Sequence, residues 1–356
     1  MSESLERSKR FAERYGLSAP ILLAPMAGAC PVELSVAVAS AGGLGACGVL
    51  LMEPEGIESW VSDVRAGTNG GFQLNTWIPD PEPVRNSQHE ASIREFLSQW
   101  GPEVDEDAGD RTAPDFAAQC EAMIEARPQV MSSIMGLYPE PIVKRMKQAD
   151  IAWFATVTTV SEALAAEAAG ADVIVAQGME AGGHRGTFVS GDAEKSLVGL
   201  FSLLPAVVDA VNIPVVATGG IADSRGASAA LLLGASAVQI GTGFLRTQEA
   251  GIAPAWAAAM ENIRPEQTSA TRAFSGRLGR SVRTEYLKAT EQGGAPVPAP
   301  YPIQRNLTAA MRASAVKEDS LEGMQAWAGQ SASLARCDSA KIVLEDIWAG
   351  MQESLS

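Results

Sequence analysis

The residues best suited to chemistry lie in segment 177–186, which reads Gln-Gly-Met-Glu-Ala-Gly-Gly-His-Arg-Gly. Residues 172–176, an apolar and β-branched run, precede it and are typical of a buried parallel strand. His184 is one of only two histidines, and its glycine neighbours allow the backbone to approach a ligand closely. The imidazole could act as a general base, as an electrostatic partner of an anion or as a brace for its loop. The other histidine, His89, lies in a polar stretch, where we expect solvent exposure and no chemical role.

Two more strand-like segments end in glycine. Residues 218–221 read Thr-Gly-Gly-Ile, and residues 239–243 read Gln-Ile-Gly-Thr-Gly. Exposed backbone N–H groups and the positive end of a following helix favour a bound phosphate. The alternative is that these glycines only permit tight turns, although two such ends together with the glycines before His184 favour a ligand site.

Three amide side chains occupy similar positions at the carboxyl ends of predicted strands: Asn75, Gln177 and Gln239. An amide can both donate and accept hydrogen bonds. Three amides that converge on one opening suit a planar heterocycle such as an isoalloxazine ring, whereas each amide alone could equally tie loops together.

Eight apolar segments alternate with alanine-rich helical segments. The predicted strands cover residues 21–26, 43–49, 71–77, 129–135, 151–158, 172–178, 213–220 and 237–245. The predicted helices cover residues 32–41, 54–65, 114–126, 139–148, 160–169, 197–210 and 224–233. Eight βα units predict an α/β fold of the (β/α)8 TIM barrel type. The alternative, an open doubly wound sheet, lacks the G-x-G-x-x-G fingerprint that usually opens its first helix.

The spacing predicts two parts. Residues 1–245 would form the barrel, with an insertion at 78–114 after the third strand, because a loop of that length exceeds an ordinary βα connection. Residues 246–356 would form a helical extension that packs on the barrel mouth and covers the active site. Within this extension, the proline-rich stretch 293–302 is a poor helix and suits a covering strap.

The composition limits the possible partners. The chain of 356 residues has a formal net charge of −15, which disfavours nucleic acid and anionic lipid. The N-terminus has no apolar signal region and no segment is long enough to span a membrane, so we expect a cytoplasmic protein. The four cysteines have no metal-site spacing, and we expect no metal. The sequence leaves open a monomer or a homodimer.

Basic residues nevertheless cluster between residues 272 and 312. They are Arg272, Arg277, Arg280, Arg283, Lys288, Arg305 and Arg312, and only Glu285 and Glu291 accompany them. The cluster either is ion-paired within the protein or solvated, or it faces an anion, and the sequence does not decide between these interpretations.

Taken in order, these motifs resemble the nitronate monooxygenases, formerly called 2-nitropropane dioxygenases. The motifs are residues 24–26 (Ala-Pro-Met), 42–45 (Gly-Gly-Leu-Gly), 71–75 (Gly-Phe-Gln-Leu-Asn), 177–184, 217–221 (Ala-Thr-Gly-Gly-Ile) and 239–242 (Gln-Ile-Gly-Thr). The C-terminal motifs at 276–281, 300–302 and 327–330 resemble the bacterial class I branch. The resemblance covers almost the whole chain.

The resemblance implies a TIM barrel that binds FMN and oxidises alkyl nitronates, such as propionate 3-nitronate, with O2 to a carbonyl compound and nitrite. It implies that His184 is the catalytic residue, and it suggests Tyr301 as a hydrogen-bond donor to the substrate. The cofactor-binding residues that it implies are Ala24, Pro25, Met26, Asn75, Gln177, Gly182, Gly183, Gly219, Gly220, Gln239, Ile240, Gly241 and Thr242.

Three other functions stay open at this point. The nearest is an FMN-dependent reductase that uses NAD(P)H to reduce quinones or an enoyl thioester. A non-enzymatic flavin-binding protein would not need His184. An aldolase-like barrel would need a lysine or an acidic pair at a strand end, and none of the predicted strands ends that way. The sequence does not identify the physiological substrate.

Overall fold

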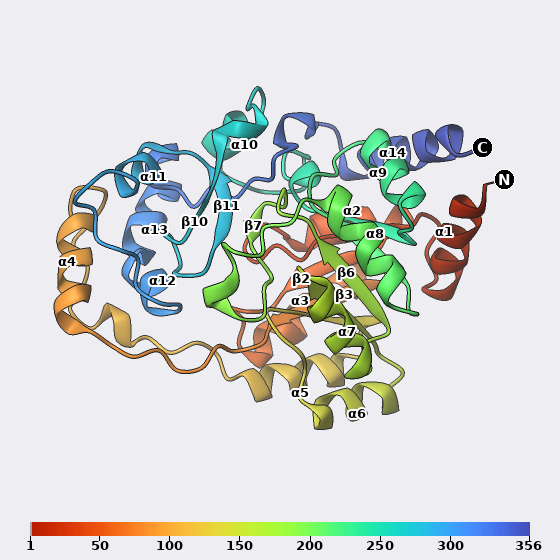
Figure 1. The fold of residues 1–356 in the computed structure, drawn as a ribbon, viewed down its shortest axis with the longest axis horizontal. Coiled ribbons are helices and arrows are strands. Elements are labelled where there is room, and N and C mark those ends of the chain that lie inside the picture. Colours follow the sequence, from red (N-terminus) through yellow and green to blue (C-terminus); the bar gives the residue numbers. More distant parts are fainter. Residues whose placement is uncertain (1) are drawn as a thin grey trace.

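The computed structural model describes residues 2–356 and confirms the predicted (β/α)8 barrel (Figure 1). Its eight parallel strands hydrogen-bond in the order β1-β9-β8-β6-β5-β4-β3-β2. They are β1 (Ile21–Leu23), β2 (Gly45–Gly48), β3 (Phe72–Trp77), β4 (Val130–Ile134), β5 (Ala152–Val157), β6 (Val173–Gln177), β8 (Val215–Thr218) and β9 (Ala237–Ile240). The Leu22–Leu44 bridge joins β1 to the β2 end of the sheet, with Leu23 N–H donating to the Leu44 carbonyl at 2.9 Å.

The helices that cover the barrel occupy the predicted segments. They are α2 (Val32–Ser40), α3 (Pro54–Gly67), α5 (Phe116–Ala126), α6 (Glu140–Gln148), α7 (Val160–Ala168), α8 (Leu200–Ala210) and α9 (Ser224–Leu232). Side-chain caps fix several of their N-termini, for example Asp115 on α5, Thr159 on α7 and Asp223 on α9. Helix α14 (Ala340–Ser354) packs against α9 and α2 and so completes the outer ring.

Helix α1 (Glu3–Arg14) was not predicted, and it packs beside the N-terminal ends of the strands. Its Phe11 packs against Tyr15 and Phe154, with ring centroids 4.9 and 6.2 Å apart, and the three side chains are buried. They belong to a cluster of buried residues that point into the barrel from several strands, including Val130 and Val216. The helix therefore closes the end of the barrel opposite the strand tips that would carry chemistry.

The insertion at 78–114 contains a helix that the sequence did not predict, α4 (Ser87–Leu97), and a short turn η1 (Ala108–Asp110). Helix α4 packs against α12 of the C-terminal region, where Ile93 and Leu97 share a buried cluster with Leu307. Residue His89 on α4 is half-buried at the surface, and its Nε2 lies 2.8 Å from the Val297 carbonyl oxygen. The insertion is thus joined to the proline-rich stretch.

The C-terminal region beyond β9 adds short elements over the barrel mouth. Its helices are α10 (Pro254–Ala259), α11 (Glu285–Thr290), α12 (Ile303–Leu307) and α13 (Ala309–Lys317), with the turns η3 (Thr242–Phe244), η4 (Pro265–Gln267), η5 (Leu321–Gly323) and η6 (Ala332–Leu334). Its strands β10 (Thr268–Thr271) and β11 (Gly279–Val282) form a small antiparallel sheet with β7 (Gly183–His184), while η2 (Ser190–Asp192) follows β7. The small sheet attaches the histidine segment to the C-terminal region.

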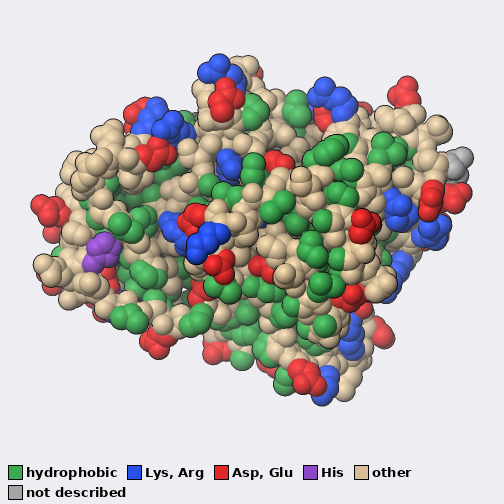
Figure 2. Space-filling view, in the orientation of Figure 1, with side chains coloured by type: hydrophobic (Ala, Val, Ile, Leu, Met, Phe, Trp, Pro, Cys, Tyr) green, Lys and Arg blue, Asp and Glu red, His purple; other side chains and the backbone are tan. Residues whose placement is uncertain are grey.

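Within residues 2–356, no helix is both long enough and apolar enough to cross a membrane. The same residues contain no group of three or more His, Cys, Asp or Glu side chains arranged to hold a metal ion. Acidic side chains are scattered over the face shown in Figure 2 rather than gathered in one patch.

The aromatic cluster at the closed end of the barrel predicts a large effect of one substitution. Phe154→Ala should lower the free energy of unfolding by about 3–5 kcal/mol, because the ring is fully buried and helix α1 packs on it. Urea denaturation checks this, with Leu164→Ala on the exposed side of α7 as the control. A Phe154→Ala loss no larger than that of the control would contradict the packing described here.

Candidate active site

A cavity of about 760 Å³ lies at the carboxyl ends of the barrel strands, under the helices of the C-terminal region. Most residues proposed from the sequence line it: Ala24, Pro25, Met26, Asn75, Gln177, Gly182, Gly183, His184, Gly219, Gly220, Gln239, Gly241 and Thr242. Two proposed residues do not. Ile240 is buried behind the wall, where its carbonyl accepts the Ala24 N–H at 2.9 Å, and Tyr301 packs on Trp77 with ring centroids 5.2 Å apart.

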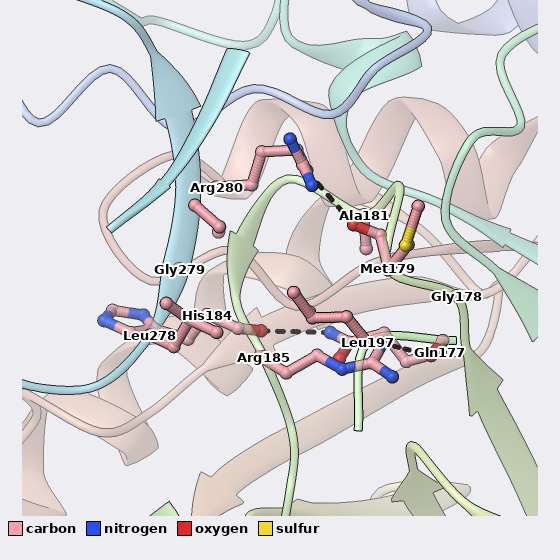
Figure 3. Close-up of a pocket in the computed structure, with 12 residues that line it drawn as sticks. Gln177, Gly178, Met179, Ala181, His184, Arg185, Leu197, Leu278, Gly279 and Arg280 are labelled. Atoms are coloured by element: carbon pink, nitrogen blue, oxygen red, sulfur yellow. Dashed lines mark hydrogen bonds between the residues drawn. The ribbon is translucent and has the colours of Figure 1, made fainter. Parts of the chain in front are cut away.

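The position of His184 is fixed by the small sheet and by two indole rings. Strand β7 pairs His184 with Gly279 of β11. The imidazole meets the rings of Trp77 and Trp327 edge to face, at centroid distances of 4.6 and 4.8 Å. Figure 3 shows the imidazole and the Arg185 side chain on opposite sides of the β7 ribbon. Three chain regions, at Trp77, His184 and Trp327, therefore meet at this side chain.

Ser275 selects the tautomer of His184. The Ser275 hydroxyl lies 2.7 Å from His184 Nε2, and it also donates to the Arg277 carbonyl at 3.2 Å. That carbonyl accepts no other hydrogen bond within the described chain, so a hydroxyl that donated to His184 instead would leave it unsatisfied. The arrangement that satisfies all groups puts the proton on Nε2 and leaves Nδ1 as the basic nitrogen.

The surroundings of His184 keep its imidazole neutral. Burial first, and then the positive charges of Arg277, Arg305 and Arg312, together lower the pKa of His184 from 6.5 to about 3. No Asp or Glu of the described chain lines the cavity to oppose this effect. In this structure His184 is an uncharged base in a positive field.

Gln177 braces the loop that carries His184. Its amide nitrogen donates to the His184 carbonyl at 3.0 Å (Figure 3). Its amide oxygen accepts the Gly186 N–H at 2.8 Å. Behind this loop, Arg185 and Arg280 donate to backbone carbonyls beside a small cavity of about 10 Å³, room for about one water molecule. Gln177 therefore reaches the main cavity with much of its hydrogen-bonding capacity already used.

The other two amides keep free groups for a ligand. The Asn75 side chain donates to the Ser132 hydroxyl at 3.0 Å, and its amide oxygen Oδ1 accepts no hydrogen bond in the described chain. The amide oxygen of Gln239 accepts a hydrogen bond from the Gln73 amide at 3.1 Å, and the side-chain N–H groups of Gln239 make no hydrogen bond within the described residues. The two side chains therefore offer the cavity both an amide oxygen, from Asn75, and amide N–H donors, from Gln239.

The glycine-rich ends of β8 and β9 present backbone donors. Gly219 and Gly220 have φ values of 105° and 71°, which residues with a side chain rarely adopt. The N–H groups of Gly219, Gly220 and Gly241 have no acceptor elsewhere in the described chain. Helix α9 begins at Ser224, a few residues beyond them. These groups can bind an anion such as a phosphate.

Some basic residues of the cluster at 272–312 are ion-paired within the protein and others face the cavity, so each interpretation made from the sequence holds for part of the cluster. Arg272 pairs with Glu194, Arg283 with Glu291 and Lys288 with Glu285. The buried Arg277 pairs with Asp80 of the insertion through two hydrogen bonds, one of them 2.7 Å long, between Arg277 Nε and Asp80 Oδ2. By contrast, Arg305 and Arg312 line the cavity.

Several site residues were missed by sequence reasoning. Trp77, Trp327 and Ser275 surround His184, yet a lone Trp or Ser carries no chemical signature in a sequence. Trp77 ends the third predicted strand and Trp327 begins the 327–330 motif, so their positions were the available signals.

The depressed pKa of His184 predicts an acid-sensitive contribution to stability. Between pH 8 and pH 5 the unfolded chain gains a proton at this residue that the folded protein does not, so stability falls as the pH drops below 6.5. Wild type should lose about 2 kcal/mol more unfolding free energy over this interval than His184→Asn. Urea denaturation at the two pH values measures it, and equal losses would show that the folded pKa is ordinary.

Comparison with known proteins gives a consistent result. The family model for nitronate monooxygenase matches residues 11–350. A probable nitronate monooxygenase of Staphylococcus aureus (strain MSSA476) is 35% identical over 341 residues, which cover 95% of this chain and 96% of that protein.

Two solved structures are also similar over nearly the whole chain. Nitroalkane oxidase from Streptomyces ansochromogenes superposes with a TM-score of 0.89 at 33% identity and covers 97% of this chain and 98% of that one. FabK from Thermotoga maritima superposes with a TM-score of 0.75 at 28% identity and covers 97% and 96%. The chain therefore belongs to the nitronate monooxygenase family, and it is an oxidoreductase.

Proposed function

We propose that this enzyme uses FMN to oxidise alkyl nitronates, such as propionate 3-nitronate, with O2 to a carbonyl compound and nitrite, with His184 as the catalytic residue. The observation that carries the proposal is the lining of the cavity, where His184 shares one space with Arg305 and Arg312 and with no carboxylate of the described chain. The lowered pKa of His184 agrees with this. A nitronate is already an anionic carbon acid, so it needs an anion-accepting site more than a strong base.

The residues of the cavity fit FMN. The free N–H groups of Gly219, Gly220 and Gly241 would hold its phosphate, and the acceptor of Asn75 with the donors of Gln239 would meet the ring edge. A side chain at Gly241 would lie 3.2 Å from Ala24 Cβ and from Met26 Sδ, so glycine allows the end of β9 to approach residues 24–26 closely. Bound FMN would supply the electron-accepting chemistry, and the protein would orient it.

His184 would work through the tautomer that Ser275 selects. Its bare Nδ1 can accept a proton, and the field of Arg277, Arg305 and Arg312 attracts an anionic substrate to the same chamber. The low pKa makes His184 a weak base toward a neutral nitroalkane, and a bound anion would raise that pKa. The geometry therefore favours nitronates over neutral nitroalkanes as substrates.

We propose that the chain has two functional parts: residues 1–245, which form the FMN-binding barrel, and residues 246–356, which cover the active site. Residues of α12 and α13 that line the cavity support this, whereas α14 packs on the barrel flank against α9 and α2. We also propose that the enzyme works in the cytoplasm as a monomer or homodimer, without nucleic acid or lipid partners. The net charge of −15 supports this.

The second candidate is an FMN-dependent reductase of quinones or of an enoyl thioester that uses NAD(P)H. The likeness to FabK at 28% identity fits this alternative. The two functions differ in the electron donor. Under anaerobic conditions, flavin bleaching by propionate 3-nitronate but not by NADH supports the nitronate reaction, and rapid bleaching by NADH supports the reductase.

Replacement of His184 tests the main proposal. His184→Asn should lower the rate of nitrite release from propionate 3-nitronate by at least 100-fold, because proton transfer or charge compensation by the imidazole is lost, while bound flavin stays unchanged. His89→Asn is the matched control. Unchanged nitrite release by His184→Asn would eliminate the catalytic assignment, whereas no nitrite release by the flavin-loaded wild type would favour a protein that only binds flavin.

Replacement of Ser275 tests how His184 is positioned. Ser275→Ala should lower kcat about 10-fold, the effect of one lost hydrogen bond, and Ser275→Thr should restore part of it. The pH dependence of kcat should also shift, because the tautomer is no longer selected. Ser269→Ala on β10 controls for changes in the small sheet. If the pH dependence of kcat in Ser275→Ala matched that of wild type, Ser275 would serve only in packing and would not select the tautomer of His184.

A further inference from the structure

Two arginines on the roof of the cavity have no carboxylate partner. Arg305 lies on α12 and Arg312 on α13, and both line the cavity. Within the described chain the Arg305 guanidinium makes no hydrogen bond or ion pair. Arg312 donates only to neutral acceptors: the Thr308 hydroxyl at 3.1 Å, the Gln325 side chain at 3.2 Å and the Arg305 carbonyl at 2.8 Å.

This arrangement is unfavourable unless an anion binds. Burial first, and then the positive charge of Arg305, lower the pKa of Arg312 from 12.5 to about 10. Most other basic residues of the 272–312 cluster have acidic partners, and the chain as a whole is strongly acidic. The two roof arginines therefore differ from most of the cluster in having no acidic partner within the described residues. Guanidinium groups form their strongest, charge-assisted hydrogen bonds with anions, so these two are available to bind one.

The roof arginines share the chamber of His184 but lie apart from the glycine-rich strand ends. Both charges act on His184 and lower its pKa. The N–H groups proposed for the cofactor phosphate belong to the barrel, at the ends of β8 and β9, whereas the arginines come from helices of the C-terminal region. The cavity thus offers two anion sites on different walls, with the imidazole in contact with the same space.

We propose that Arg305 and Arg312 form a subsite for a carboxylate of the substrate, separate from its nitronate group, so that the enzyme selects nitronates that carry a second negative charge. The inference rests on the proposed nitronate oxidation. The planar fork of a guanidinium matches a carboxylate with two parallel hydrogen bonds, which gives the subsite its specificity.

Binding of unreactive analogues tests the subsite without turnover. Succinate has the skeleton of propionate 3-nitronate with a carboxylate in place of the nitronate, and butyrate replaces the second carboxylate by a methyl group. By titration calorimetry, the flavin-loaded enzyme should bind succinate about 10- to 100-fold more tightly than butyrate. Equal affinities for the two acids would overturn the proposal.

Variants assign the preference to the roof. Arg305→Met should remove most of the preference for succinate, Arg305→Lys should keep part of it, and Arg283→Met, a surface residue paired with Glu291, should keep all of it. In nitrite assays, Arg305→Met should raise KM for propionate 3-nitronate about 10- to 100-fold and leave KM for propyl-1-nitronate nearly unchanged.

Two other outcomes would contradict the assignment. If Arg305→Met raised both KM values equally, the guanidinium would act on the nitronate group, and if the variant lost its flavin, the guanidinium would hold the cofactor. Absence of nitrite release from every nitronate, with the preference for succinate intact, would instead refute the proposed function and leave the anion subsite standing.

Discussion

An imidazole held neutral among positive charges is the interaction on which this site depends. His184 lies between two indole rings, in a cavity that no carboxylate of the described chain lines, and the charges of three arginines lower its pKa. In water such a side chain would be protonated at mildly acidic pH, whereas here burial and like charge both oppose protonation. An anion that enters the cavity relieves the repulsion and makes proton acceptance by His184 easier. The site is therefore selective for anions before any specific contact is made.

The fold maintains this state through contacts between distant parts of the chain. The insertion supplies Asp80, which pairs with Arg277 and forms no ion pair with the two arginines of the roof in the described chain. The C-terminal region supplies Ser275, β11 and the roof helices, and β7 links His184 to them. The barrel contributes the strand tips with their free amides and N–H groups. Because each part supplies one element of the site, displacement of any one would change both the charge and the position of the imidazole.

The sequence predicted the barrel because each strand and helix carries a local signature, and all eight strands lie where the apolar segments indicated. The sequence also predicted that His184 and most of the glycines and amides lie at one end of the barrel. It did not predict α1, whose buried apolar residues Leu5, Phe11 and Ala12 stand among many charged and polar ones, or α4, which lies within an insertion of otherwise loop-like composition. Tyr301 and Ile240 miss the cavity lining because their positions depend on packing that no local pattern records. For the same reason the paired and unpaired arginines of 272–312 could not be separated before the structure showed which of them Asp80, Glu194 and Glu291 reach.

Nuclear magnetic resonance of the imidazole nitrogens tests the neutral histidine most directly, since the chain has only two histidines and a His89→Asn variant assigns them. In ¹⁵N-labelled enzyme, His184 should show a protonated Nε2 and a bare Nδ1, and it should stay neutral from pH 8 down to pH 5. A His184 signal that titrates near pH 6.5, or one with the proton on Nδ1, would contradict this account of the site.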